Sequence, residues 1–227
     1  MKVFLATPAY NGEVSGSYAS SLMLACADCA RRDIEVMPNI VANGAFIEIA
    51  RTLLVQRFLE TDCTHLFFVD ADLGFDAHAF AGLVQAGVPF AAGVYRKRMA
   101  EVAFMCHVSQ PEEMRGPWLR MDRVATGFMC LERRVLEEMS KRARIQPFIG
   151  AYENVPMVFH TVYGERFIGE DYAFCDDYNA LYEEGVFDQP IWVYPDITFR
   201  HDDFLGNLHE SLSTELDEPR ILHRGET

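Results

Sequence analysis

The chain has 227 residues, of which half are apolar and 12% aromatic, so it is long enough to bury the core of one large domain. Its 20 basic and 34 acidic residues give a formal charge of −14, which disfavours non-specific binding to nucleic acid or anionic lipid. No apolar run approaches the roughly 18 residues of a membrane span. The apolar start, residues 2–6, is too short for a signal peptide and is typical of a first core strand, so we expect a cytoplasmic protein.

The six cysteines mostly lie inside apolar segments, as is typical of small buried side chains in a reducing compartment. Cys26 and Cys29 form a C-x-x-C pair within a helical pattern, and the chain has no second such pair. A zinc site is therefore not expected there.

In chain order, the first part of the sequence alternates between strand and helix. Strands are predicted at 2–6, 34–37, 65–69 and 90–95, and helices at 17–32, 45–60 and 77–86. This order favours a mixed, mainly parallel α/β sheet of the Rossmann-like kind, with helices on both faces.

The second part is more mixed. Strands are predicted at 101–108, 123–125, 128–131, 191–193 and 198–200, with a turn at Gly116-Pro117 and helices at 133–141 and 171–184. Residues 144–168 are predicted to be irregular. Without repeats or a clear linker, we expect one domain over residues 1–203, followed by a tail or lid over 204–227.

The strongest chemical signal is the stretch Phe67-Phe68-Val69-Asp70-Ala71-Asp72. It predicts a buried strand that ends in two carboxylates, which point the same way because they are two residues apart on an extended chain. Ligands bind at the carboxyl ends of strands in open α/β sheets. Two hard anionic oxygens there suit Mg²⁺ or Mn²⁺, with water and phosphate oxygens completing the shell. The plainer alternative is an aspartate that caps the following helix.

Arg51 lies on or beside the apolar stripe of the helix predicted at 45–60. A guanidinium there needs a carboxylate or phosphate partner, which could be Asp70, Asp72 or a bound diphosphate. The alternative is that its long side chain reaches the surface.

Three further groups could carry chemistry. Glu170 and Asp171 follow Gly169 at a predicted helix start, a suitable mount for a general base, although acidic residues also favour that position through the helix dipole. His201 follows a short strand and could bind Mn²⁺ or simply face solvent. Tyr10, at the first strand end, could stack on a nucleobase, and the basic run 96–98 could bind phosphates or form a solvated turn.

Taken in order, these features resemble the GT-A glycosyltransferases, and in particular small bacterial and phage members close to family 2. The segments that carry the resemblance span most of the chain: Thr7-Pro8-Ala9-Tyr10, Ala50-Arg51, residues 65–72, Ala92-Gly93-Val94-Tyr95, Thr126-Gly127-Phe128-Met129, residues 169–175 and His201.

The resemblance implies a single-domain GT-A fold and a nucleotide-sugar-dependent, hexosyltransferase-type enzyme that inverts the sugar. It implies that Mn²⁺ or Mg²⁺ is held by Asp70, Asp72 and His201, and that Asp171, beside Glu170, is the general base. The implied contacts to a UDP- or GDP-sugar are Thr7, Ala9, Tyr10, Arg51, Asp70, Ala71, Lys97, Thr126 and Gly127. The acceptor remains open: a glycan, a lipid-linked sugar, a protein or a modified base.

Other readings of the same residues remain. A phosphohydrolase of the haloacid-dehalogenase type also carries D-x-D at a strand end, but usually follows the pair with a hydroxyl residue, where this chain has Leu73-Gly74. A nucleotidyltransferase normally needs a basic, glycine-rich loop after its first strand. A non-catalytic module could bind a nucleoside diphosphate and a metal without transferring a sugar.

Overall fold

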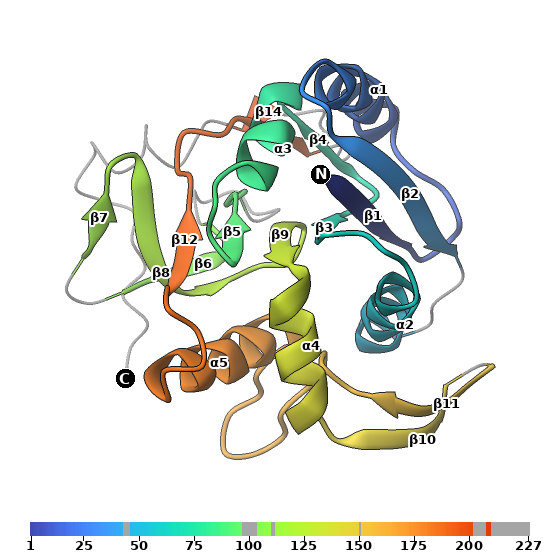
Figure 1. The fold of residues 1–227 in the computed structure, drawn as a ribbon, viewed down its shortest axis with the longest axis vertical. Helices are drawn as coiled ribbons and strands as arrows, with labels where there is room; N and C mark the ends of the chain where they lie inside the picture. Colours follow the sequence, from blue (N-terminus) through green and yellow to red (C-terminus); the bar gives the residue numbers. More distant parts are fainter. Residues whose placement is uncertain (43–45, 97–103, 110–111, 150, 202–207, 210–227) are drawn as a thin grey trace.

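The computed structural model describes residues 1–42, 46–96, 104–109, 112–149, 151–201 and 208–209. A central sheet separates two helical layers (Figure 1). One layer contains α1 (Gly16–Arg31) and α3 (Ala77–Val84), and the other contains α2 (Ile47–Leu59), α4 (Arg133–Arg142) and α5 (Glu170–Glu183). Within the described residues, no helix is both long and apolar enough to cross a bilayer.

Nine strands of the described chain form the central sheet, in the order β2-β1-β3-β9-β5-β12-β8-β6, with β7 added beside β8. Their bounds are β1 Lys2–Ala9, β2 Glu35–Ala42, β3 His65–Val69, β5 Phe90–Ala92, β6 Cys106–Val108, β7 Met114–Arg115, β8 Trp118–Val124, β9 Phe128–Glu132 and β12 Ile191–Val193. The strands β2, β1, β3, β5 and β12 run one way, while β9 and β8 run against their neighbours. The predicted mixed, mainly parallel sheet with helices on both faces is confirmed.

Alternation along β1 and β3 divides the core between the two faces of the sheet. Phe4 and Phe68 pack with α2, α4 and α5, whereas Leu5 and Phe67 pack with α1 and α3. These strands carry apolar residues on both faces because both faces are covered by helices, which is typical of parallel sheets.

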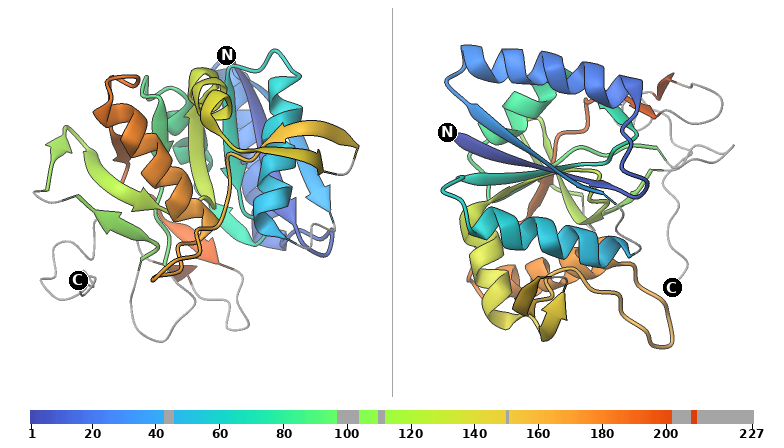
Figure 2. Two further views of the ribbon diagram at one scale, coloured as in Figure 1. Left: turned by 90° about the horizontal axis from the view of Figure 1, so that it is seen from below. Right: turned by 90° about the vertical axis from the view of Figure 1, so that its right-hand side faces the viewer.

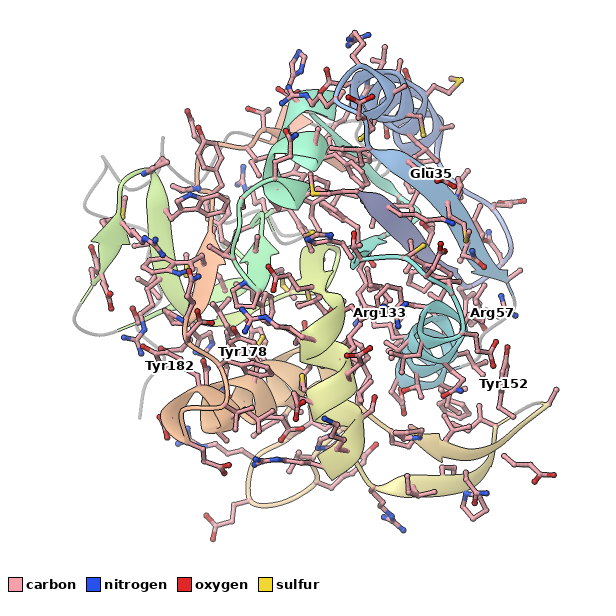
Figure 3. The ribbon with its side chains drawn as sticks, in the orientation of Figure 1. Glu35, Arg57, Arg133, Tyr152, Tyr178 and Tyr182 are labelled. Atoms are coloured by element: carbon pink, nitrogen blue, oxygen red, sulfur yellow. The ribbon has the colours of Figure 1, made fainter. Side chains whose placement is uncertain are left out.

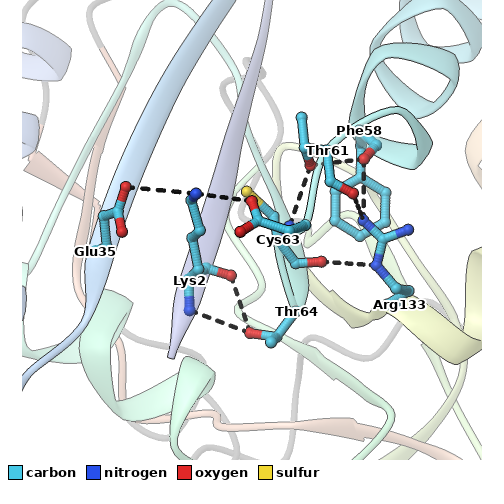
Figure 4. Close-up of polar contacts among 8 residues, drawn as sticks. Lys2, Glu35, Phe58, Thr61, Cys63, Thr64 and Arg133 are labelled. Atoms are coloured by element: carbon cyan, nitrogen blue, oxygen red, sulfur yellow. Dashed lines mark hydrogen bonds and ion pairs between the residues drawn. The ribbon is translucent and has the colours of Figure 1, made fainter.

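Arg133, the first residue of α4, links the end of α2 to the segment before β3 (Figures 3 and 4). Its guanidinium donates to the carbonyl oxygens of Cys63, Phe58 and Thr61 at 2.8, 3.1 and 2.7 Å, and lies 4.5 Å from the centre of the Phe58 ring. A cation there adds a charged donor to these carbonyls and complements the dipole at the end of α2. The contact fixes the end of α2 against the segment that leads into β3; α2 carries Arg51, and Asp70 follows β3 directly.

Two smaller pairings complete the fold. Strands β10 (Ile145–Ile149) and β11 (Tyr152–Pro156) form an antiparallel hairpin, and β4 (Leu73–Phe75) pairs with β13 (Phe199–His201), which also pairs with β14 (Leu208–His209). The prediction that residues 144–168 are irregular is wrong over this hairpin. The strand β4, which begins directly after the D-x-D pair, was not predicted.

Most predicted elements are present, but several bounds differ by three residues or more, among them the ends of β1 and β5 and the start of β8. The difference in β2 has a clear physical reason. The second strand was predicted to end at Met37 because proline follows, yet β2 continues through Pro38 to Ala42. This strand is at the edge of the sheet and pairs with β1 alone, so the missing N–H of Pro38 breaks no required bond. The predicted turn at Gly116 is confirmed by its φ of +58° between β7 and β8. The expected tail at 204–227 lies almost entirely outside the described residues, as does the first part of the strand predicted at 101–108.

Candidate functional site

A cavity of about 770 Å³ opens at the carboxyl ends of β1 and β3. Its walls come from the end of β1 and the segment after it, the end of β2, the start of α2 and the segment after β3: Pro8, Ala9, Tyr10, Asn11, Glu13, Val14, Ser15, Val41, Ile47, Ala50, Arg51, Asp70, Ala71 and Asp72. Because β1 and β3 are parallel neighbours, their carboxyl ends meet at one edge of the sheet. The structure therefore brings both carboxylates of the D-x-D pair, Arg51 and Tyr10 to one cavity, as the sequence predicted.

Asp70 is held in place by one backbone hydrogen bond and by two donors to its carboxylate. Its backbone N–H donates to the carbonyl of Gly127 at 3.0 Å, Arg51 Nη2 lies 3.4 Å from Oδ1, and Tyr95 Oη donates to Oδ2 at 3.2 Å. A Cβ on Gly127 would lie 2.2 Å from Tyr95 Oη and 2.5 Å from Asp70 Oδ2, so only glycine leaves room for this bond. The Asp70 carboxylate is thus oriented by the fold.

Arg51 is 5% exposed and joins the D-x-D segment to the start of α5. Besides Asp70, its guanidinium forms an ion pair with Glu170. Burial acts to lower the pKa of Arg51, but the charges of Asp70 and Glu170 outweigh it, so the pKa is raised and the cation persists. The predicted pairing with Asp70 is present, the alternative of a surface position is wrong, and the second partner, Glu170, was not predicted.

Glu170 and Asp171 occupy the first turn of α5, whose N-cap is Gly169. Burial raises the pKa of both carboxyl groups above their ordinary values, and Arg51 opposes that rise. Glu170 is engaged by Arg51, while Asp171 Oδ1 accepts the N–H of Tyr172 at 2.8 Å. Of the two, Asp171 is the one without an ion-pair contact among the described residues, and a raised pKa makes its carboxylate the stronger base.

The remaining predicted residues fall in different surroundings. Tyr10 is 78% exposed at the mouth of the cavity, and Ala9 lines it. Thr7 is fully buried, with its Oγ1 2.6 Å from Tyr18 Oη, so its side chain does not reach the cavity. Thr126 is also fully buried, and its hydroxyl has no hydrogen-bond partner within the described chain.

Two predicted residues are placed only in part or not at all. The backbone of His201 pairs with Leu73, the residue after Asp72, through the β13–β4 ladder. This pairing puts His201 in register beside the D-x-D segment, although its side chain is not described. Lys97 lies outside the described residues.

The residues present fit a divalent cation that keeps open positions. No group of three or more His, Cys, Asp or Glu side chains in the described part of the chain is arranged to enclose a metal ion. Asp70 and Asp72 nevertheless offer oxygen ligands on the wall of a cavity wide enough for water and phosphate. Mg²⁺ and Mn²⁺ are commonly held by one or two carboxylates together with substrate phosphates.

Sequence reasoning did not assign a role to Tyr95, which orients Asp70. Its hydroxyl is buried, and the pKa of Tyr95 is raised well above 10, first by burial and then by the Asp70 charge, so it remains a donor. The available signal was the position of Tyr95 at the end of a strand predicted to finish at the same edge as β3.

Comparison with known proteins supports the fold. The sequence matches no family model and no curated protein. Among solved structures, A197 from STIV aligns over 93% of this chain and 94% of its own, with a TM-score of 0.54 and 16% identity. At this identity the likeness shows a shared fold alone.

Two other solved structures align less closely. One is a glycosyltransferase involved in the glycosylation of the major capsid of PBCV-1, with a TM-score of 0.32, 9% identity and coverage of 61% of this chain and 63% of that one. The other is S. aureus TarS 1-349, with a TM-score of 0.42, 14% identity and coverage of 95% and 61%. Because both TM-scores are below 0.5, neither structure supports an inference about the site.

Proposed function

We propose that this protein is a metal-dependent glycosyltransferase of the GT-A, family 2-like type, which transfers a sugar from a UDP- or GDP-sugar to an acceptor hydroxyl with inversion. The observation that supports the proposal is the cavity that Asp70, Asp72 and Tyr10 share. Buried Arg51 links Asp70 to Glu170, the neighbour of Asp171 in the chain. The volume of the cavity, roughly 770 Å³, lies within the usual range for small-molecule sites.

The donor would occupy this cavity. Tyr10 offers an exposed ring for stacking on the nucleobase, and Asp70 and Asp72, together with His201, would hold the Mn²⁺ or Mg²⁺. When bound, that ion supplies Lewis-acid stabilisation of the charge that develops on the departing diphosphate. The buried cation of Arg51 holds Asp70 in a fixed orientation throughout, so little reorganisation is needed as that charge develops.

Asp171 would accept the proton of the acceptor hydroxyl as its oxygen attacks the anomeric carbon. The pKa of Asp171 lies above its ordinary value of 3.8 because the carboxyl is buried, and it must be deprotonated to act as a base. Transfer should therefore rise with pH through that pKa and level off above it. Glu170 is a positioning residue in this scheme, since its carboxylate is bound to Arg51.

None of the six cysteines, all of which lie in described parts of the chain, forms a disulfide, which is compatible with the reducing cytoplasm in which we expect the enzyme to act.

The proposal is tested by release of nucleoside diphosphate from a panel of UDP- and GDP-sugars, with and without Mn²⁺. Water can attack the donor in place of the acceptor hydroxyl, so the assay needs no known acceptor. Mn²⁺-dependent release that Asp72→Ala abolishes supports the proposal. Release of inorganic phosphate from sugar phosphates, without use of nucleotide sugars, would favour a phosphohydrolase instead.

A further inference from the structure

A pair of aromatic rings projects into solvent from the segment that leads into the proposed catalytic helix. Tyr163 is 80% exposed and Phe167 is 70% exposed, and their ring centres lie 5.7 Å apart at an angle of 69°. The neighbouring Val162 is also exposed, at 38%. Three large apolar side chains within six residues form a patch that a folded protein seldom leaves uncovered without a use for it.

This pair belongs to a short closed loop with a fixed base. The backbones of Val162 and Ile168 exchange two hydrogen bonds, at 3.0 and 3.1 Å, so the five intervening residues form the loop tip. Ile168 is followed directly by Gly169, the N-cap of α5, and then by the acidic pair. The rings are thus anchored to the same helix end that carries Asp171.

Both views in Figure 2 place the segment around residues 157–168 at the end of the molecule toward which β1 runs. Tyr10 and Phe46, at the end of β1 and the start of α2, lie at this same end. Among the described side chains, these four are the tyrosines and phenylalanines that are exposed: Tyr10, Phe46, Tyr163 and Phe167. The exposed tyrosines and phenylalanines of the described chain therefore lie at the end of the molecule where the cavity opens.

The composition of the loop identifies its partner. Two rings of about 150–250 Å² each present at most roughly 300–500 Å², which is less than the ~800 Å² per partner of a stable protein interface. The formal charge of −14 disfavours an anionic membrane or a nucleic acid. A sugar ring instead has a C–H face that can pack on an aromatic ring, and hydroxyls at its rim. Glu165 and Arg166, which are exposed and lie between Tyr163 and Phe167 in the sequence, can accept from and donate to those hydroxyls.

We propose that the loop 162–168 binds the acceptor, and that the acceptor is a glycan whose terminal sugar packs on Tyr163 and Phe167. The proposal rests on the glycosyltransferase function proposed above and narrows its acceptor to a carbohydrate. Tyr10 lines the cavity proposed for the donor, and the loop continues directly into the helix that carries Asp171.

The test is binding of the labelled full-length chain to an array of immobilised oligosaccharides, in the presence of Mn²⁺ and UDP or GDP. The double variant Tyr163→Ala/Phe167→Ala should bind the glycans recognised by wild type at least about tenfold more weakly. The control variant Met23→Ala/Leu24→Ala removes side chains that are 68% and 62% exposed on α1, and it should bind as wild type does. Melting temperatures of both variants check that they are folded.

The inference is overturned if wild type binds no glycan on the array, or if the two double variants bind equally well. It is also overturned if the loop variant instead loses binding to phosphatidylcholine–phosphatidylglycerol vesicles. The proposed donor chemistry is judged separately, by nucleoside diphosphate release from wild type in water. Glycan binding without nucleoside diphosphate release would reject the transferase proposal and support the glycan site. Nucleoside diphosphate release without loop-dependent glycan binding would support the transferase proposal and reject the glycan site.

Discussion

Replacing Arg51 by methionine is the perturbation that probes the site most deeply, because this one cation neutralises two carboxylates from different elements. Its side chain is 7% exposed, and those of Asp70 and Glu170 are 26% and 15% exposed. Water therefore cannot fully solvate the two carboxylates once the guanidinium is gone. Removing one partner of a buried ion pair costs about 3–5 kcal/mol.

For a chain of this length, that loss corresponds to a fall in melting temperature of roughly 6–20 °C. Urea unfolding and calorimetry would measure it. The matched control is Arg134→Met, because Arg134 also binds two carboxylates, Glu132 at 2.7 Å and Asp188 at 3.0 Å, but is 46% exposed. Each exposed pair contributes only about 0–1 kcal/mol, so the loss of both should lower the melting temperature of the control by at most ~8 °C.

The stability lost in Arg51→Met should also depend on pH. Arg51 lowers the pKa of Glu170 and Asp171, so its removal raises both further above their ordinary values. A carboxyl whose pKa is raised in the folded state stabilises that state when protonated, and this benefit is lost as pH rises through the pKa. The difference in free energy of unfolding between wild type and Arg51→Met should thus be smaller at pH 5 than at pH 8. A loss no larger than that of Arg134→Met, or a difference independent of pH, would refute the reasoning.

Three more substitutions test individual roles in the site. Asp72→Ala should abolish Mn²⁺-dependent release of nucleoside diphosphate, and a wild-type rate would exclude Asp72 as a metal ligand. Asp171→Asn should keep nucleoside diphosphate affinity but slow transfer by ~10²–10⁴-fold at neutral pH, whereas equal loss of both would make Asp171 structural. Gly127→Ala should weaken nucleoside diphosphate binding, because the added Cβ overlaps Tyr95 and displaces the Asp70 carboxylate. Its control, Gly82→Ala, adds a Cβ with no neighbour within 4 Å inside α3, and should keep affinity and gain up to about 1 kcal/mol of stability.

The layered fold was predictable because its signals are local and periodic. The buried strand before Asp70 and the apolar spacing of the first three helices fix element type directly, and their alternation fixes the layer order. The end of β2 was missed because a proline in an edge strand has the same sequence signal as a strand break. The β10–β11 hairpin was missed because its exposed strands lack the clean alternation of a half-buried pair.

The sequence predicted the site residues that a single segment identifies, but not the contacts between distant segments. Asp70, Asp72 and Arg51 were found from burial pattern and residue chemistry, and the structure places them in one cavity. The bond from Arg51 to Glu170 joins residues 119 positions apart, and nothing local to either residue encodes it. The fit of Gly127 under Tyr95 is likewise a tertiary contact, visible only once β5 and β9 lie side by side.

The central claim is that Asp70 and Asp72 bind a divalent cation whose coordination shell is completed by a diphosphate. The most direct test is a crystal structure of the protein grown with Mn²⁺ and UDP or GDP, with anomalous scattering recorded to locate manganese. We expect one manganese peak within coordination distance of Asp72 and of the diphosphate oxygens. A nucleotide bound with no manganese peak at either carboxylate would contradict the account.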